Sequence, residues 1–312
     1  MFTQRKSRRC NYPEINKAFE EGIEPDDLKP FLPMLKDLKA CADCLRKNRS
    51  ERGALNFDFP EYKVVLDLDG TPLRIEKRIR GAAEMMIEDA MIAANEAVAR
   101  FLEKTGNTSV YRVHDHPDEE KLNALKRLVS IMGLPIHIPE DPTPKDIQKL
   151  LESVEGEDIE PVVQVMTLRS LPQACYKTEN AGHFGIASKC YTHFTSPIRR
   201  YPDLMVHRLI RQALSEQLKK NQLKAQTDFL VRACDHCSET EQNATQTERD
   251  VDDLKMTEYM IPFVGEPFDA HITGITRFGI FVGLDNGVEG LIHIDTMEDD
   301  EYVYQADSMT LK

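Results

Sequence analysis

The stretch YTHFTSPIRRYPDLMVHR, residues 191–208, decides the fold that we assign to this chain of 312 residues. Ser196 and Pro197 are typical of a helix start, because a serine side chain caps the first turn and proline tolerates its first position. Arg199 and Arg200 then fall in the first turn, where the helix dipole disfavours each cation by roughly 0.3–1 kcal/mol. A phosphate bound at this helix start, by free backbone N–H groups and a guanidinium, explains the placement.

Two further residues bear on this hypothesis. Thr195 is an alternative cap for the same helix. Asp203 lies four residues after Arg199, where it can hold that arginine in one rotamer. The alternative interpretation is a surface helix whose two arginines are simply paired with neighbouring acids.

Composition excludes several classes of protein. Hydrophobic residues make up 41% of the chain, enough for a folded core, and the length favours one larger and one smaller domain. A net charge of −13 argues against general adhesion to nucleic acid or membrane, but leaves room for a local basic channel, and TQRKSRR (3–9) is locally basic. No apolar run has the length of a membrane-spanning helix, and the N-terminus has no apolar signal segment. We therefore expect a cytoplasmic protein without a membrane partner.

The seven cysteines allow two interpretations. Cys41 and Cys44, like Cys234 and Cys237, have the C-x-x-C spacing of zinc ligands. Both pairs lie in helical patterns that are far apart in the sequence, and this favours free thiols in a reducing compartment over a structural zinc site.

Hydrophobic periodicity and turn residues divide the chain into elements. We expect helices over 13–22, 25–48 (ended by Gly53), 81–104, 118–132, 160–177, from the opening motif to about 219, and 222–258. Strands are expected over 54–58 and 62–79, the second broken by an Asp69-Gly70 turn, with a short extended piece at 110–115 and, at 138–148, a surface loop that leads into a helix. The helix over 81–104 should bury one apolar stripe, made by Met86, Ile87, Ala90, Met91, Ala94, Val98 and Phe101.

The pattern of apolar and polar residues changes after residue 263. PFDAHITGITRFGIFVGLDNGVEGLIHI, residues 267–294, alternates apolar and polar residues with glycines between them. This pattern predicts three strands in succession and hence a second, β-rich domain.

The segment HFGIASKCYTHFTSPIRRYPDLMVHR, residues 183–208, resembles the signature of the RNase II/RNase R exoribonucleases, the RNB family. The resemblance extends over NYPEI (11–15), RGALNFDFPE (52–61), IEDAMIAANEAVARFL (87–102), YRVHDHP (111–117) and HCSETEQNATQTERDVDDL (236–254). The last β segment resembles an S1-type OB fold, which makes the pattern closer to RNase R than to RNase II. The implied fold class is α+β, with the carboxyl-proximal part of an RNB domain over 1–262 and a partial S1-type domain over 263–312.

The resemblance implies a processive 3′→5′ exoribonuclease that hydrolyses single-stranded RNA to nucleoside monophosphates. It implies that Arg199 contacts the scissile phosphate and that Glu248 lies near the catalytic centre. Tyr12 and Glu88 match positions that distinguish ribose from deoxyribose through the 2′-OH. Phe57 matches an aromatic residue that stacks on the terminal base, although an ordinary core phenylalanine is the alternative.

Further RNA contacts are implied for Arg200 and for the S1-type segment. There, Phe278, Phe281 and His293 would form a platform for bases, unless one of the two phenylalanines is a core residue. The expected partner is the 3′ end of single-stranded RNA, and we infer no stable protein partner. Tyr191, His193 and Tyr201 are expected to be structural, and His114 and His116 are given no role.

Catalysis in this family depends on aspartates that hold Mg²⁺ upstream of the segment matching residues 11–15. We therefore expect this cluster to be missing and the chain to be catalytically incomplete. Asp250, Asp252 and Asp253 are no substitute, because adjacent positions on a predicted helix cannot all face one ion. The segment after Phe263 is also short for a five-stranded OB barrel, so we expect the last two strands to be missing and the chain to be a fragment.

Two other functions are compatible with parts of the sequence. VVLDLDGTP, residues 64–72, matches the nucleophile motif of haloacid dehalogenase phosphatases, with Asp67 as nucleophile and Asp69 as acid and base. That fold needs a parallel sheet after the motif, whereas the sequence predicts a hairpin followed by helices. A non-catalytic RNA-binding protein is the other alternative, because the RNA contacts do not need the metal-binding aspartates.

Overall fold

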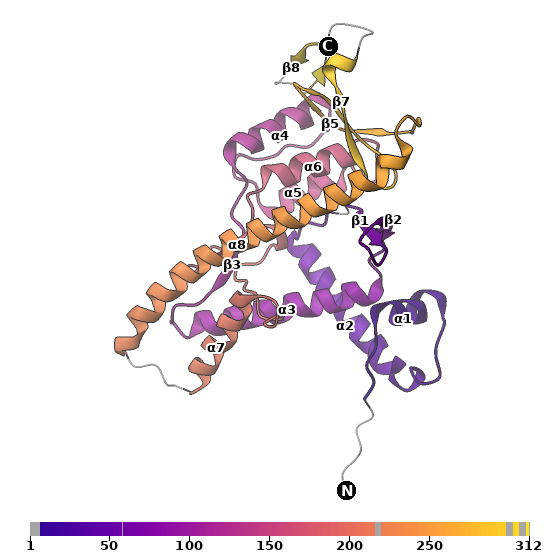
Figure 1. The fold of residues 1–312 in the computed structure, drawn as a ribbon. Helices are drawn as coiled ribbons and strands as arrows, with labels where there is room; N and C mark the ends of the chain where they lie inside the picture. Colours follow the sequence, from indigo (N-terminus) through magenta and orange to yellow (C-terminus); the bar gives the residue numbers. More distant parts are fainter. Residues whose placement is uncertain (1–6, 58, 216–219, 298–301, 306–309, 312) are drawn as a thin grey trace. The chain divides into compact units, whose positions relative to one another are not determined.

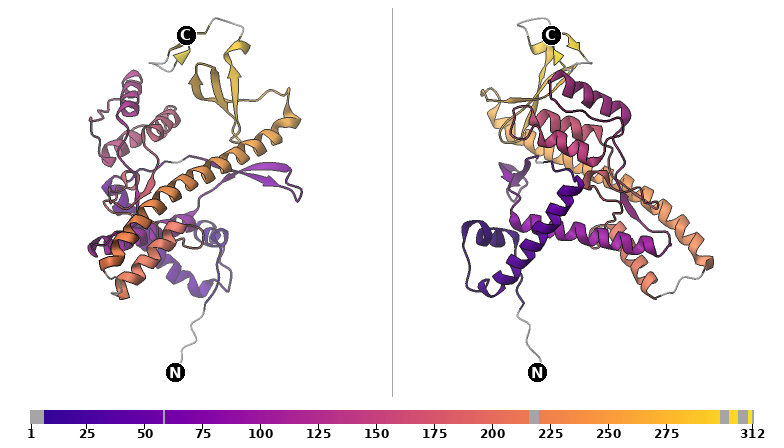
Figure 2. Two further views of the ribbon diagram at one scale, coloured as in Figure 1. Left: turned by 60° about the vertical axis from the view of Figure 1, so that its left-hand side comes forward. Right: turned by 180° about the vertical axis from the view of Figure 1, so that it is seen from behind.

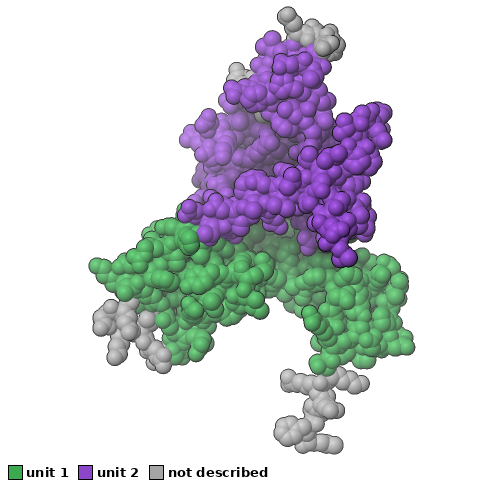
Figure 3. All heavy atoms as spheres, in the orientation of Figure 1, with its two compact units in different colours: residues 1–54, 79–114, 174–237 green, residues 55–78, 115–173, 238–312 purple. Residues whose placement is uncertain are grey.

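The computed structural model describes residues 7–57, 59–215, 220–297, 302–305, 310 and 311 (Figure 1). It divides into two compact units (Figure 3): unit 1 comprises residues 1–54, 79–114 and 174–237, and unit 2 comprises residues 55–78, 115–173 and 238–312. Parts of three predicted features lie outside the described residues, namely the basic residues 3–6, position 58 of the first predicted strand, and 216–219 at the end of a predicted helix.

Unit 1 begins with a short helix, α1 (Tyr12–Asn16), which is capped by Asn11 and continues as a π-helical turn to Glu21. A 3₁₀ turn at Lys29–Phe31 leads into α2 (Leu32–Arg52), so the helix predicted from residue 25 starts later. Gly53 ends α2 with φ of 100°, a left-handed conformation that glycine adopts without strain. The predicted helix end is therefore confirmed.

Helix α3 (Ala82–Lys104) follows the predicted range closely, but it buries a different face. Met86 is buried as expected, whereas Phe101 is 41% exposed. Asp89, Asn95 and Glu96 are buried instead. The apolar stripe was thus partly wrong, because arginines on α2, which crosses α3 (Figure 2), supply partners for buried acids on this face.

The rest of unit 1 packs a short antiparallel sheet against two helices. Strand β3 (Tyr111–Val113) pairs with β4 (Cys175–Lys177), and the helices are α7 (Tyr201–Ser215) and α8 (Lys220–Met260), whose last part belongs to unit 2. Their shared core contains Leu102, Val110, Tyr176, Met205, Val206, Leu209, Leu230 and Cys234. The helix predicted over 160–177 is wrong for its last residues, which form β4.

Unit 2 contains an antiparallel hairpin, β1 (Glu61–Leu66) and β2 (Pro72–Arg78). The predicted turn is confirmed at Gly70, whose φ is 84°. Residues 54–57 are not a strand, which corrects the prediction for that segment. The unit also contains the helices α4 (Glu119–Ile131), α5 (Pro144–Glu152) and α6 (Glu160–Ser170).

The carboxyl-terminal part of unit 2 is β-rich, as predicted. Helix α8 ends in a 3₁₀ turn at Ile261–Phe263, which leads into the strands (Figure 2). Three strands, β5 (His271–Thr276), β6 (Gly279–Gly283) and β7 (Glu289–His293), form an antiparallel sheet in that order. Two shorter strands, β8 (Tyr304–Gln305) and β9 (Thr310–Leu311), pair with each other in a separate sheet. The expectation that two strands are missing after the first three is therefore wrong. Within the described ranges, the helices all lack an apolar stretch long enough to cross a membrane.

Candidate functional site

The predicted phosphate-binding arginine lies on a tight turn immediately before a helix. The backbone N–H groups of Arg199 and Arg200 donate to the carbonyl of Ser196, at 3.3 and 3.0 Å. Helix α7 starts at Tyr201 and not at Ser196, so the two arginines precede its first turn. Pro202, rather than Pro197, occupies the position in the first turn that suits proline. The expectation of two arginines within the first turn of a helix was therefore wrong.

Asp203 of α7 holds this turn in place through two hydrogen bonds. Its side chain is completely buried and accepts hydrogen bonds from the Ser196 backbone N–H at 2.7 Å and from Nη2 of Arg200 at 2.8 Å. The predicted pairing of Asp203 with Arg199 is thus corrected to Arg200. Because Arg200 is held inward, with 20% of its side chain exposed, Arg199 is the arginine of the pair that faces solvent.

Three polar atoms around the turn lack a hydrogen-bond partner among the described residues, namely Thr195 Oγ1, Arg200 Nε and Asp203 Oδ2. Leaving a buried polar group unpaired costs about 1–3 kcal/mol. These unpaired atoms therefore make an unfavourable contribution to the stability of the turn.

The chain entering the turn is held by Asn95 of α3. Asn95 is buried, donates from Nδ2 to the Tyr191 hydroxyl at 3.0 Å, and accepts from the Phe194 backbone N–H at 3.0 Å. The Phe194 ring stacks on His207 of α7 at 4.2 Å between centroids, and His207 Nε2 donates to the Phe194 carbonyl at 2.9 Å. Neither Asn95 nor His207 is among the site residues predicted from the sequence.

A buried cluster of aromatic and histidine side chains lies behind the same segment. Tyr176 and His193 share a hydrogen bond of 2.8 Å, and the Arg112 guanidinium lies 4.6 Å from the Tyr176 ring centre. Burial, followed by the charges of Arg200 and Arg112, lowers the pKa of His193 to about 2. A neutral, half-buried imidazole suits the structural role expected for His193, while Tyr201 is exposed.

Helices α2 and α3 are joined by ion pairs. Asp89, with 2% of its side chain exposed, contacts Nη2 of Arg46 at 2.8 Å and Nη2 of Arg49 at 2.9 Å. Glu96 contacts Arg52 at 2.8 Å. Burial alone would raise the pKa of Glu96, but hydrogen bonds from Arg52 and Ser188 and the Arg52 charge give a net lowering.

The two residues matched to ribose discrimination both lie in unit 1. Tyr12 is 45% exposed on α1, and Glu88 lies on α3, paired with Arg80 and, at 3.8 Å, with Arg49. Asn16 joins the two helices, since its amide donates to Glu84 at 2.7 Å and accepts from the Ala83 backbone N–H at 2.7 Å.

The predicted residues of unit 2 include Phe57 and Glu248. Phe57 is half-buried and stacks on Phe59, with 5.9 Å between ring centroids. Glu248 is exposed on α8, and so are the nearby Asp250, Asp252 and Asp253, as expected for a solvated helix face.

The three-stranded sheet of unit 2 carries the other predicted RNA contacts. Phe278 lies on the turn between β5 and β6, half exposed, with the Arg277 guanidinium 4.6 Å from its ring centre. Phe281 is half-buried within β6, opposite Leu291 of β7. His293 ends β7 opposite Gly279 and is exposed.

The described residues do not fit a metal centre. No three His, Cys, Asp or Glu side chains of the described ranges come together where they could hold an ion. Neither the Mg²⁺ implied by the resemblance nor a zinc ion at the cysteine pairs finds three such ligands among the described residues.

Asp67 has a structural role in the turn between β1 and β2. Its Oδ1 accepts from the backbone N–H groups of Asp69 and Thr71, at 2.9 and 2.8 Å. The flanking strands are antiparallel, whereas the phosphatase motif requires the end of a strand in a parallel sheet. The structure therefore contradicts the phosphatase hypothesis.

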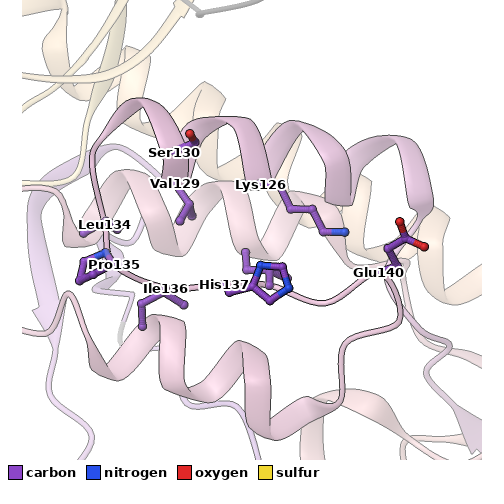
Figure 4. Close-up of a pocket in the computed structure, with 9 residues that line it drawn as sticks. Lys126, Val129, Ser130, Leu134, Pro135, Ile136, His137 and Glu140 are labelled. Atoms are coloured by element: carbon purple, nitrogen blue, oxygen red, sulfur yellow. The ribbon is translucent and has the colours of Figure 1, made fainter.

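Unit 2 also has a surface pocket of about 700 Å³ (Figure 4). Helix α4 contributes Lys126, Val129 and Ser130, and the loop over 134–140 supplies the other lining residues. None of the predicted site residues lines this pocket.

Comparison with known proteins identifies the family. The chain matches the RNB domain over residues 4–216 and the S1 RNA binding domain over residues 261–310. Ribonuclease R of Thermotoga maritima is 37% identical over 311 residues, which are 98% of this chain and 44% of that protein. Ribonuclease R of Aquifex aeolicus is 40% identical over 294 residues, or 94% of this chain and 40% of that protein.

A solved structure agrees with these relatives. Mycoplasma genitalium RNase R in complex with ribose methylated single-stranded RNA superposes with a TM-score of 0.90 and 31% identity, covering 96% of this chain and 47% of that one. The chain thus spans less than half the length of each of these three relatives. With an RNB domain, an S1 domain and ribonuclease R relatives over nearly all of its residues, the chain belongs to the RNB family of ribonucleases.

Proposed function

We propose that this chain is the carboxyl-proximal part of an RNase R-like 3′→5′ exoribonuclease and that it binds the 3′ end of single-stranded RNA. The observation that carries the proposal is the solvent-facing Arg199 on a turn whose neighbour, Arg200, is fixed by the buried Asp203. A guanidinium held in place by its backbone can bind a phosphate with little loss of side-chain freedom.

Other residues support RNA as the ligand. The S1-type sheet offers the exposed Phe278 and His293, and stacking on such side chains tolerates any base. Tyr12 and Glu88 lie on two helices that Asn16 joins, so both can face one ribose. Because the overall charge is −13, binding depends on these local contacts and not on a general positive surface.

The proposal is tested by fluorescence anisotropy of a 5′-labelled single-stranded RNA with a free 3′ end, at several salt concentrations. We expect Arg199→Ala to weaken binding roughly tenfold and to reduce the slope of log affinity against log salt by about 0.7, the value for one phosphate contact on a single strand. Arg211→Ala, an exposed arginine further along α7, is the matched control. Equal affinities and slopes for the Arg199→Ala chain and the unmodified chain would contradict the proposal.

A second candidate is RNA binding without hydrolysis by this chain alone. It is favoured by the observation that the described residues form no group suited to hold Mg²⁺. The proposed role of the described residues is therefore to bind and orient the strand, and we assign them no bond-breaking step.

A further inference from the structure

We infer that Asn95 is a positioning residue for Arg199. It anchors the chain where it enters the turn over residues 196–200, which we call the arginine turn. The inference rests on the proposed function, because it concerns how the same turn binds phosphate. Asn95 itself is buried on α3, so its effect on RNA would pass through the turn and not through direct contact.

The anchoring is direct and uses both ends of one amide group. Asn95 Oδ1 accepts the Phe194 backbone N–H, and Asn95 Nδ2 donates to the Tyr191 hydroxyl, each at 3.0 Å. A side chain that accepts a backbone N–H fixes the main chain at that residue. Phe194 lies five residues before Arg199, so its backbone position determines where the turn begins.

Two other hydrogen bonds hold residues 194–196, and both come from α7, whereas the bond from Asn95 comes from α3. His207 binds the Phe194 carbonyl and Asp203 binds the Ser196 N–H, and both of these residues belong to α7. They fix the chain that enters the turn relative to α7. Asn95 fixes the same Phe194 residue relative to α3.

Helix α3 is a suitable fixed point because ion pairs hold it on both sides of Asn95. Asp89, six residues earlier, pairs with Arg46 and Arg49, and Glu96, the next residue, pairs with Arg52. The same helix carries Glu88, which lies seven residues before Asn95 and therefore on a similar face. One helix thus sets the spacing between a group matched to ribose and the turn that presents Arg199.

The experiment uses the full chain with Asn95→Ala, and Asn180→Ala as its matched control. Asn180 also ties a loop to α3, donating to Glu103 at 2.7 Å, but its other bonds go to Lys189 and Gly182 and not to the arginine turn. Hydrogen–deuterium exchange of peptides covering residues 192–200 measures the anchoring without RNA. RNA affinity is then measured for Asn95→Ala, Arg199→Ala and the double variant.

We expect Asn95→Ala to increase exchange over residues 192–200 at least tenfold more than Asn180→Ala does, because the Phe194 amide loses its acceptor. We expect it to weaken RNA binding by roughly tenfold, as for loss of one charged contact, and to add less than about twofold when Arg199 is already alanine. A variant that merely destabilised the fold would weaken binding in both backgrounds.

Each outcome distinguishes the two proposals. Unchanged exchange over residues 192–200 in Asn95→Ala overturns the inference, whatever the RNA affinity. Increased exchange with full RNA affinity in Arg199→Ala overturns the proposed function, and the role of Asn95 in RNA binding falls with it. Equal effects of Asn95→Ala in the presence and absence of Arg199 overturn the inference alone.

Discussion

The carboxylate of Asp203 is completely buried and holds the guanidinium of Arg200 at 2.8 Å, while the adjacent Arg199 is left facing solvent. Two neighbouring arginines therefore have different tasks, one inside the fold and one at its surface. The distinction can be tested by stability measurements.

Asp203→Ala should destabilise the chain strongly. It leaves the partly buried Arg200 without its carboxylate and the Ser196 N–H without an acceptor, and breaking one side of a buried ion pair costs roughly 3 kcal/mol. Urea unfolding followed by circular dichroism measures the loss. Asp252→Ala, an exposed aspartate on α8, should change the unfolding free energy by less than about 0.5 kcal/mol. Similar unfolding midpoints for the two variants would show that the buried pair contributes little.

Stability should fall as the solution becomes mildly acidic because of His193. Its pKa is lowered to about 2 in the folded chain, mainly by burial, while the unfolded chain binds a proton near the ordinary value of 6.5. Below pH 6.5 the unfolded state therefore binds more protons, and each such histidine removes up to about 1.4 kcal/mol per pH unit. His183, whose pKa burial lowers to about 3, acts in the same direction.

The measurement is the slope of unfolding free energy against pH between 6.5 and 4.5. His193→Gln should reduce that slope by the equivalent of about one bound proton. Parallel slopes for the His193→Gln chain and the unmodified chain would mean that the buried imidazole is not neutral.

Glu96 should stabilise the chain at neutral pH and lose this contribution in acid. Its pKa is lowered in the fold, so its contribution is complete above the ordinary value of 4.5 and disappears as the pH falls through the lower folded value. Glu96→Gln should reduce the unfolding free energy at pH 7 by roughly 1–3 kcal/mol, because hydrogen bonds from Arg52 lose their charge. The difference between the two chains should shrink steadily below pH 4.5, and a constant difference would refute the assignment.

The chain alone should not degrade RNA when Mg²⁺ is added. The described residues offer no group of three side chains that could hold the ion. Purified chain incubated with 5′-labelled single-stranded RNA and Mg²⁺ should leave the RNA intact on a denaturing gel. A ladder of shortened products that is absent with Arg199→Ala would contradict this prediction.

Much of the fold could be predicted from local sequence. The helix over 81–104, the Asp69-Gly70 hairpin and the three strands after residue 263 follow from periodicity and turn residues, which act over a few positions. Strand β4 was missed because its partner, β3, lies about sixty residues earlier, and nothing local distinguishes it from the end of a helix. The start of α7 was misplaced because Pro197 and Pro202 both suit a first turn.

The sequence predicted a site residue only where that residue type is unusual at its position, such as an arginine near a helix start. Arg199 and Arg200 are such residues, and in the structure Arg199 is exposed to solvent. Asn95 has no such unusual position, because it adjoins Ala94 in a stripe that the periodicity predicts to be apolar. The available signal was that a buried asparagine needs partners for its amide, but the partners at residues 191 and 194 are brought to it only by the tertiary fold.

The ion pairs between the arginines of α2 and the carboxylates of α3 also restrict how the two helices align. Asp89 and Glu96 are two turns apart on α3, and Arg46, Arg49 and Arg52 follow the matching stretch of α2. Sliding one helix past the other by a single turn, about 5.4 Å, would take all three guanidinium groups away from their carboxylates at once. A purely apolar contact between the helices would be less sensitive to such a shift. The ion pairs therefore favour one alignment of α2 along α3.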